Sequence, residues 1–115
     1  MARLRRKLDL VFSLWVRKRD ADDRGMGRCI SCQDWALLQA GHFIPRQYTA
    51  VRWHPLNVNG QCARCNCWLH GNQAEYYVQL VKFYGQGTVD KLMELKHTTV
   101  NMKRADFEEL IERYS

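Results

Sequence analysis

The chain has 115 residues, of which 46% are hydrophobic and 26% are charged, and its formal net charge is +6. This length predicts a single domain with a modest core. No apolar run approaches the roughly 18 to 20 residues that a membrane span requires, and the basic N-terminus lacks the apolar stretch of a signal peptide. We therefore expect an intracellular protein.

An amphipathic helix is predicted within residues 3–20. Its apolar side chains recur at steps of three and four and form one stripe: Leu4, Leu8, Val11, Phe12 and Trp15. Residues 1–28 hold nine Lys or Arg against four Asp, so most of the net charge lies in this helix and the loop after it. A localised basic segment favours a polyanion as partner, and a solvated helix face is the alternative. The candidate contacts are Arg5, Arg6, Arg17, Lys18 and Arg19.

Two Cys-x-x-Cys pairs, Cys29/Cys32 and Cys62/Cys65, are separated by 29 residues. Two residues between cysteines let both sulfurs face one point, and two such knuckles complete the tetrahedral thiolate site that zinc prefers. Four unrelated thiols are the alternative, and disulfides are disfavoured inside cells. Because four cysteines leave no position for water, the predicted Zn²⁺ is structural. We expect Cys67 to be a small core residue rather than an alternative ligand.

The segments around and after the cysteines predict short strands and then helices. Strands are expected at residues 35–38 and 50–53, followed by a turn from Pro55 onward. Helices are expected at residues 72–84, 88–97 and 104–114. Their apolar positions should pack onto the core: Tyr77, Leu80, Val81, Tyr84, Val89, Leu92, Met93, Leu95, Phe107, Leu110, Ile111 and Tyr114. Trp15 and Trp68 are expected in the core as well. The single domain then has three parts, residues 1–28, 29–84 and 85–115.

Three side chains near the cysteines have the chemistry of an active site. His42 lies between the two pairs, Asn57 precedes the second pair by five residues, and Asn66 follows it directly. Histidine is the usual general base near neutral pH, and an amide orients an imidazole or ligates a hard cation through its oxygen. A hydrogen-bonded structural histidine is the alternative for His42.

The order of these residues resembles a known family. The run "GHFIPR…NVNGQCARCN" is similar to the HNH nucleases. The segments "LVFSLWVRKRDA", "CISC", "AGHFIPR", "LNVNGQCARCN" and "HGNQAEYYVQL" more specifically resemble the phage Rap (NinG) family of recombination endonucleases in order and spacing. The resemblance implies an α+β fold with a zinc-bound ββα-metal core between a basic N-terminal helix and C-terminal helices. It also implies cleavage of branched DNA such as Holliday junctions, in the host cytoplasm if the chain is phage-encoded.

Carried over to this sequence, the resemblance implies a role for each residue. His42 is the general base that activates water, Asn57 positions the loop and the imidazole, and Asn66 ligates a catalytic Mg²⁺ or Mn²⁺. Arg46 and Arg52 flank this site and suit phosphate contact, with surface solubility as the alternative. Two-fold symmetry of a junction further suggests a homodimer.

The sequence departs from the HNH pattern immediately before the base. Many of those enzymes place an acidic residue or histidine there to bind the metal, but this chain has Gly41. His70, four residues after Asn66, is a candidate second ligand if a helix already begins at Asn66. A zinc-stabilised DNA-binding module without catalysis is the rival hypothesis, and a zinc-bridged protein adaptor is a third.

Overall fold

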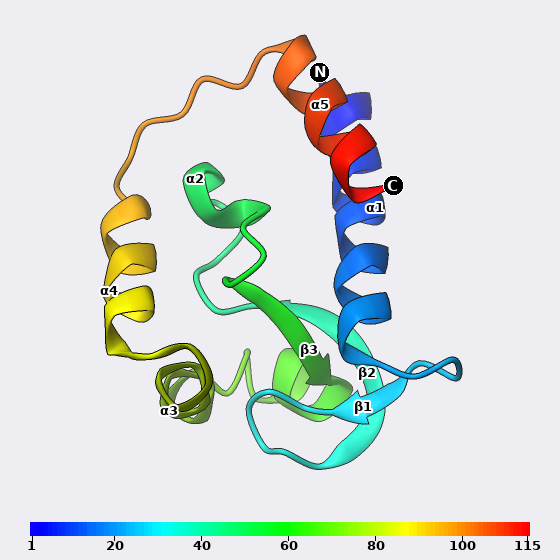
Figure 1. The fold of residues 1–115 in the computed structure, drawn as a ribbon, viewed down its shortest axis with the longest axis vertical. Coiled ribbons are helices and arrows are strands. Elements are labelled where there is room, and N and C mark those ends of the chain that lie inside the picture. The colour runs from blue at the N-terminus through cyan, green and yellow to red at the C-terminus, as the bar shows by residue number, and fades with distance from the viewer.

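The computed structural model describes all residues, 1–115. Three strands form one antiparallel sheet in the order β1-β2-β3, and helices surround it, so the predicted α+β class is confirmed (Figure 1). The elements along the chain are α1 (Ala2–Asp20), β1 (Met26–Arg28), β2 (Trp35–His42), α2 (Thr49–Arg52), β3 (Val58–Cys62), the π-type turn η1 (Arg64–Trp68), α3 (Gln73–Tyr84), α4 (Gln86–Leu95) and α5 (Arg104–Tyr114).

The long N-terminal helix is present as predicted and packs beside α5 (Figure 1). Leu8, Phe12 and Val16 are buried at steps of four, and the rings of Phe12 and Tyr114 meet edge to face at 4.8 Å. The buried stripe of α1 thus ends at Val16, one residue beyond its predicted end at Trp15, which is half-buried. Burial of this stripe stabilises a helix that has no side-chain cap at its N-terminus.

The central strand β2 pairs with β1 over its first three residues and with β3 over its last five. Both knuckles therefore meet beside the same strand, because Cys29 follows β1 and Cys62 ends β3. The strand predicted at 35–38 is correct and extends to His42. The strand predicted at 50–53 is wrong, since Thr49–Arg52 forms the helix α2. The strand β3 lies where only a turn was expected.

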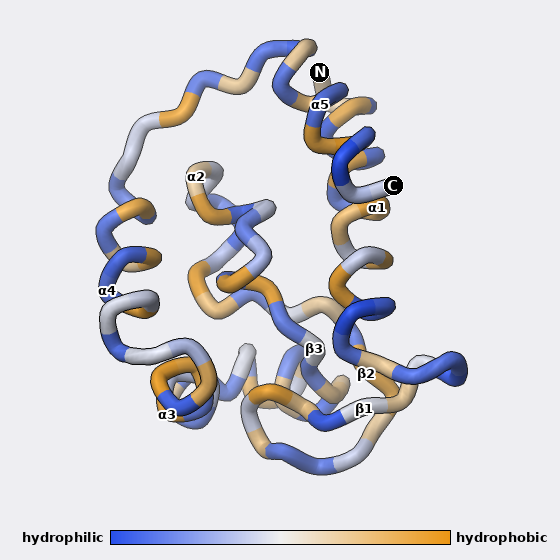
Figure 2. Tube along the Cα trace, viewed as in Figure 1, coloured by the Kyte–Doolittle hydropathy of each residue, from blue (hydrophilic) through white to orange (hydrophobic).

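The C-terminal helices divide between two apolar clusters. One cluster joins α3 and α4 to the segment after β2: Phe43, Ile44, Val51, Tyr76, Leu80, Val89 and Leu92. The other joins α1 and α5: Leu8, Phe12, Val16, Trp53, Val58 and Phe107. Residues 43–58 contribute to both clusters and therefore hold the two sides of the molecule together. Figure 2 shows apolar and polar positions alternating along α1 and α4.

Some predicted core positions are wrong by about one residue. In α3 the fully buried tyrosine is Tyr76, whereas Tyr77 is 41% exposed. The helix α4 begins at Gln86, two residues before its expected start at residue 88, and Met93 faces solvent. Trp68 was expected in the core but is 79% exposed. No helix has both the length and the apolar character required to span a membrane.

Candidate functional site

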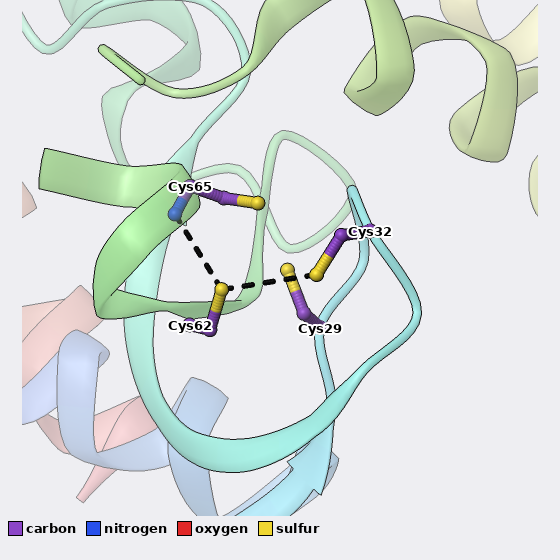
Figure 3. Close-up of side chains that lie close together, drawn as sticks. All are labelled: Cys29, Cys32, Cys62 and Cys65. Carbon is purple, nitrogen blue, oxygen red and sulfur yellow. Dashed lines mark hydrogen bonds between the residues drawn. The ribbon is translucent and has the colours of Figure 1, made fainter. Parts of the chain in front are cut away.

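The four cysteines converge at the base of the sheet, as their spacing predicts (Figure 3). Cys29 and Cys32 come from the turn between β1 and β2, Cys62 ends β3, and Cys65 lies in η1. All four sulfurs lie within 4.8 Å of one another, and the Sγ atoms of Cys32 and Cys62 are 3.8 Å apart. Tetrahedral zinc with bonds of about 2.3 Å requires sulfurs about 3.8 Å apart. The cluster therefore has the dimensions of a structural zinc site.

Two N–H groups donate to sulfurs of the cluster, while burial opposes a free thiolate. The main-chain N–H of Cys65 donates to the sulfur of Cys62 at 3.4 Å, and Asn72 Nδ2 donates to the sulfur of Cys65 at 3.5 Å. Burial raises the pKa of Cys32 to about 12, so a cation is required to hold that thiol deprotonated near neutral pH. Cys67 was expected in the core but is exposed, and it donates to Gln39 instead.

A cleft of about 490 Å³ opens between α1, the end of β2 and the segment after η1. Four of the predicted site residues line it: His42, Arg46, Asn66 and His70. They come from β2, from the connection after it, from η1 and from the turn before α3. The fold thus brings together residues that are up to 28 positions apart in the sequence.

The imidazole of His42 is oriented by a main-chain group. Its Nε2 atom lies 2.8 Å from the carbonyl oxygen of Arg52. A carbonyl only accepts, so Nε2 carries the hydrogen and Nδ1 has a free lone pair. Burial lowers the pKa of His42, and the positive charges of Arg46 and Arg52 lower it further, which outweighs the opposing effects of the Arg52 carbonyl and Asp9. His42 is therefore neutral at pH 7 and has the protonation state of a general base.

Asn57 is fully buried and organises the connection between β2 and β3. Its Nδ2 donates to the carbonyls of Ile44 and Val51, both at 3.0 Å, and its Oδ1 accepts from the N–H of Ile44 at 2.8 Å. These bonds set the course of the loop and of α2. Asn57 makes no hydrogen bond to His42 and does not line the cleft, so its effect on the imidazole passes through the main chain.

Asn66 and His70 line the cleft from different local structures, η1 and the turn after it. Asn66 donates from Nδ2 to Gln39 at 2.8 Å, which leaves its Oδ1 without a hydrogen bond. His70 does not continue the helix of Asn66, because η1 ends at Trp68 and three consecutive residues, His70, Gly71 and Asn72, have positive φ. The predicted helical spacing is thus wrong, although both side chains line the same cleft.

A sequence model of the family described as "Bacteriophage Lambda NinG protein" matches residues 3–115. The chain belongs to the NinG family. Protein ninG of Escherichia phage lambda is 33% identical over 81 residues, which are 68% of this chain and 38% of that protein. The ninG proteins of Escherichia phage 933W and Enterobacteria phage VT2-Sa match to the same extent. The chain thus aligns with less than half the length of these relatives. No solved structure gives a significant match.

The basic residues predicted to contact DNA in this NinG-family chain differ in their surroundings. Arg19 donates to the carbonyls of Pro55 and Val58, and Arg52 is only 11% exposed and paired with Asp9. These two arginines therefore have structural partners within the fold, and their predicted contact with DNA stays a prediction. The side chain of Arg46 is 60% exposed at the cleft. On α1, Arg5 stacks over Phe107, while the remaining three are exposed: Arg6, Arg17 and Lys18.

Sequence reasoning missed one residue of the cleft, Asp9, and gave no reason for the Gly41 that it noted. Asp9 lines the cleft as its one acidic residue, but the helical pattern of α1 gives no sign that Asp9 faces inward. Gly41 is explained by packing, because a Cβ there would collide with the buried side chain of Gln61. A side chain before His42 would therefore require Gln61 to move from its buried position.

Proposed function

We propose that this NinG-family chain is a metal-dependent DNA endonuclease that hydrolyses phosphodiester bonds in branched DNA such as Holliday junctions. The observation that carries the proposal is one cleft lined by His42, Asn66, His70 and Arg46. The proposal is also supported by the order of β2, β3 and the five-residue turn η1 around the four-cysteine cluster, since the HNH resemblance implies two strands followed by a helix there.

In the proposed reaction His42 accepts a proton from water at Nδ1. The water oxygen then bonds to phosphorus as the bond to the leaving sugar oxygen breaks, and that oxygen takes up a proton from solvent. Arg46 is placed to neutralise a phosphate oxygen through its exposed guanidinium. The hydrogen bond to the Arg52 carbonyl keeps the imidazole in the tautomer that this step requires.

Two donors in the cleft suit a divalent cation only in part. Asn66 Oδ1 has no other partner, and His70 is exposed at the same cleft. Mg²⁺ prefers oxygen ligands and usually keeps several waters beside substrate phosphate, so these residues would hold a cation together with the bound DNA. When bound, Mg²⁺ or Mn²⁺ would supply Lewis acidity at the scissile phosphate and the leaving oxygen.

One observation favours the rival hypothesis of a DNA-binding module without catalysis. The one carboxylate of the cleft, Asp9, is occupied by three other side chains and offers nothing to a cation. A zinc-bridged protein adaptor has no such support, because it leaves the basic α1 and the cleft without a role. Symmetric cutting of a junction requires two active sites, so we also propose a homodimer on DNA.

The decisive experiment incubates four-way-junction and linear DNA with the protein in Mg²⁺, Mn²⁺ or EDTA. We expect metal-dependent cutting that prefers the junction and is lost in His42→Ala. His97→Ala is the matched control, because His97 is exposed at the end of α4 and lies outside the cleft. Binding of junctions without cutting under any metal would replace the nuclease hypothesis with the DNA-binding one.

A further inference from the structure

Asp9 of α1 binds three side chains of the connection between β2 and β3. Its Oδ1 accepts from Arg52 Nε at 3.1 Å and from Trp53 Nε1 at 2.9 Å. Its Oδ2 accepts from Arg52 Nη2 at 2.6 Å and from Arg46 Nη2 at 3.0 Å. Although burial raises the pKa of Asp9, these hydrogen bonds and charges together lower it below its ordinary value. Asp9 is therefore ionised at neutral pH.

The carboxylate is fully occupied by these contacts. Its two oxygens offer about four acceptor sites, and four donor atoms are in place. No lone pair is left to ligate a cation, so Asp9 does not substitute for the acidic residue that Gly41 replaces. Any role of Asp9 in the cleft must therefore act through the side chains that it binds.

The contacts of Asp9 lead directly to His42. The carbonyl that accepts from His42 Nε2 belongs to the peptide unit between Arg52 and Trp53. The side chains on both sides of that peptide unit donate to Asp9. A single carboxylate on α1 thus holds the acceptor that orients the imidazole, while Asn57 holds the preceding residue, Val51, from the other side.

We propose that Asp9 is a positioning residue for His42, so that the N-terminal helix forms part of the catalytic apparatus. This inference rests on the proposed nuclease function. Asp9 acts through Arg52 and Trp53 and does not touch the reacting atoms. It fixes the tautomer and direction of the imidazole and keeps Arg46 at the edge of the cleft.

The Asp9→Asn variant distinguishes a role in positioning His42 from a role in binding DNA. The amide keeps the size of the carboxylate, but its NH₂ group faces arginine donors. Arg52 and Trp53 therefore lose some of their hydrogen bonds to residue 9. At the same time it removes a negative charge from a cleft that receives phosphate. We therefore expect junction affinity to stay equal or rise, while the single-turnover cleavage rate falls roughly tenfold to a hundredfold.

The experiment compares wild type, Asp9→Asn and the control Asp23→Asn. Asp23 is an exposed acid in the loop after α1 whose side chain makes no hydrogen bond, so Asp23→Asn removes the same charge outside the cleft. The readouts are cleavage rate, junction affinity and the ¹⁵N chemical shifts of His42, which report its tautomer. The histidine signals are assigned by comparison with His42→Ala. Zinc content and thermal unfolding verify the fold.

Wild type and Asp23→Asn should show one tautomer with hydrogen on Nε2, and Asp9→Asn should show a mixture. Unchanged His42 shifts in a folded Asp9→Asn protein would overturn the proposal. If Asp9→Asn does not fold, Arg52→Lys repeats the test, because lysine keeps the charge but cannot contact both oxygens as arginine does. Wild-type protein that cuts no DNA would refute the nuclease function, and the shifts would still decide whether Asp9 controls His42.

Discussion

The Nε2 atom of His42 lies 2.8 Å from the main-chain oxygen of Arg52, and the guanidinium of the same Arg52 is bound to Asp9. One residue therefore links the candidate base to the N-terminal helix through both its main chain and its side chain. These contacts connect the orientation of the His42 imidazole on β2 to the carboxylate of Asp9 on α1.

The lowered pKa of His42 predicts a pH dependence of cleavage. Burial disfavours the imidazolium, so the midpoint of titration should lie below the ordinary 6.5. The rate should be constant above that midpoint and fall as His42 is protonated below it. NMR titration of the His42 ring, set beside a rate profile, measures both. A His42 midpoint above 6.5 would contradict the assigned environment.

The same shift predicts a pH dependence of stability. The unfolded chain binds a proton on His42 near pH 6.5, whereas the folded chain binds it only at lower pH. The unfolded state thus carries more protons in this interval, and the free energy of unfolding decreases as the pH falls from above 6.5 through the folded-state pKa. Urea unfolding across this interval should show a smaller decrease in His42→Gln than in wild type. An equal slope in both proteins would argue against a buried neutral imidazole.

The cysteine cluster predicts one zinc ion per chain. Cys62→Ser should abolish binding and cooperative folding, since its sulfur is within 3.8 Å of that of Cys32 and zinc binding is coupled to folding. Metal analysis and thermal unfolding provide the measurement. Cys67→Ser is the matched control and should retain full zinc content, because Cys67 is exposed and outside the cluster. Zinc loss from that control would require a different ligand set.

Arg46 and Arg52 should respond differently to substitution. Arg46→Ala should weaken junction binding, with little effect on folding. The slope of log affinity against log salt concentration should fall by about one, the equivalent of one lost phosphate contact. Arg52→Ala should destabilise the fold by about 1.5 to 3 kcal/mol, because it removes charged hydrogen bonds to a partly buried carboxylate. Salt titrations of binding and urea unfolding measure the two effects. Equal behaviour of the two variants would contradict the assignment.

Asn57→Ala should cost roughly 2 to 4 kcal/mol of stability. Three hydrogen bonds of its buried amide are lost, and the main-chain N–H and carbonyl of Ile44 are left without partners, while the Val51 carbonyl keeps its bond from the His54 N–H. Asn101→Ala, at an exposed position before α5, is the control and should be nearly neutral. Denaturant unfolding with zinc present makes the comparison. A loss of activity without loss of stability would show that Asn57 acts in catalysis instead.

The features that the sequence predicts correctly depend on local spacing. The spacing of two Cys-x-x-Cys pairs predicts the cluster of four sulfurs. The recurrence of apolar residues every three to four positions predicts the buried face of α1. His42, Asn66 and His70 line one cleft as the motif order suggested, although the helical spacing assumed for His70 is wrong.

The errors occur where distant side chains decide the local structure. Residues 50–53 have the composition of a strand, but Asn57 binds Val51 and Asp9 binds Trp53, and the segment becomes helical. The sequence predicts a turn where β3 lies, because that segment contains Asn59, Gly60 and Gln61. The side-chain amide of Asn59 bonds to Tyr76 and Tyr84, and Gln61 Nε2 donates to Ser31, so most of the polar atoms there have partners elsewhere in the chain. Such long-range contacts leave no periodic signal in the sequence.

The most direct test of the nuclease function is the single-turnover rate of junction cleavage by wild type and His42→Ala, with saturating protein and Mn²⁺. We expect His42→Ala to be slower by about a hundredfold or more while binding the junction with similar affinity. Equal rates in the two proteins, or no cleavage by wild type in either Mn²⁺ or Mg²⁺, would contradict the assignment of His42 as the base of a nuclease.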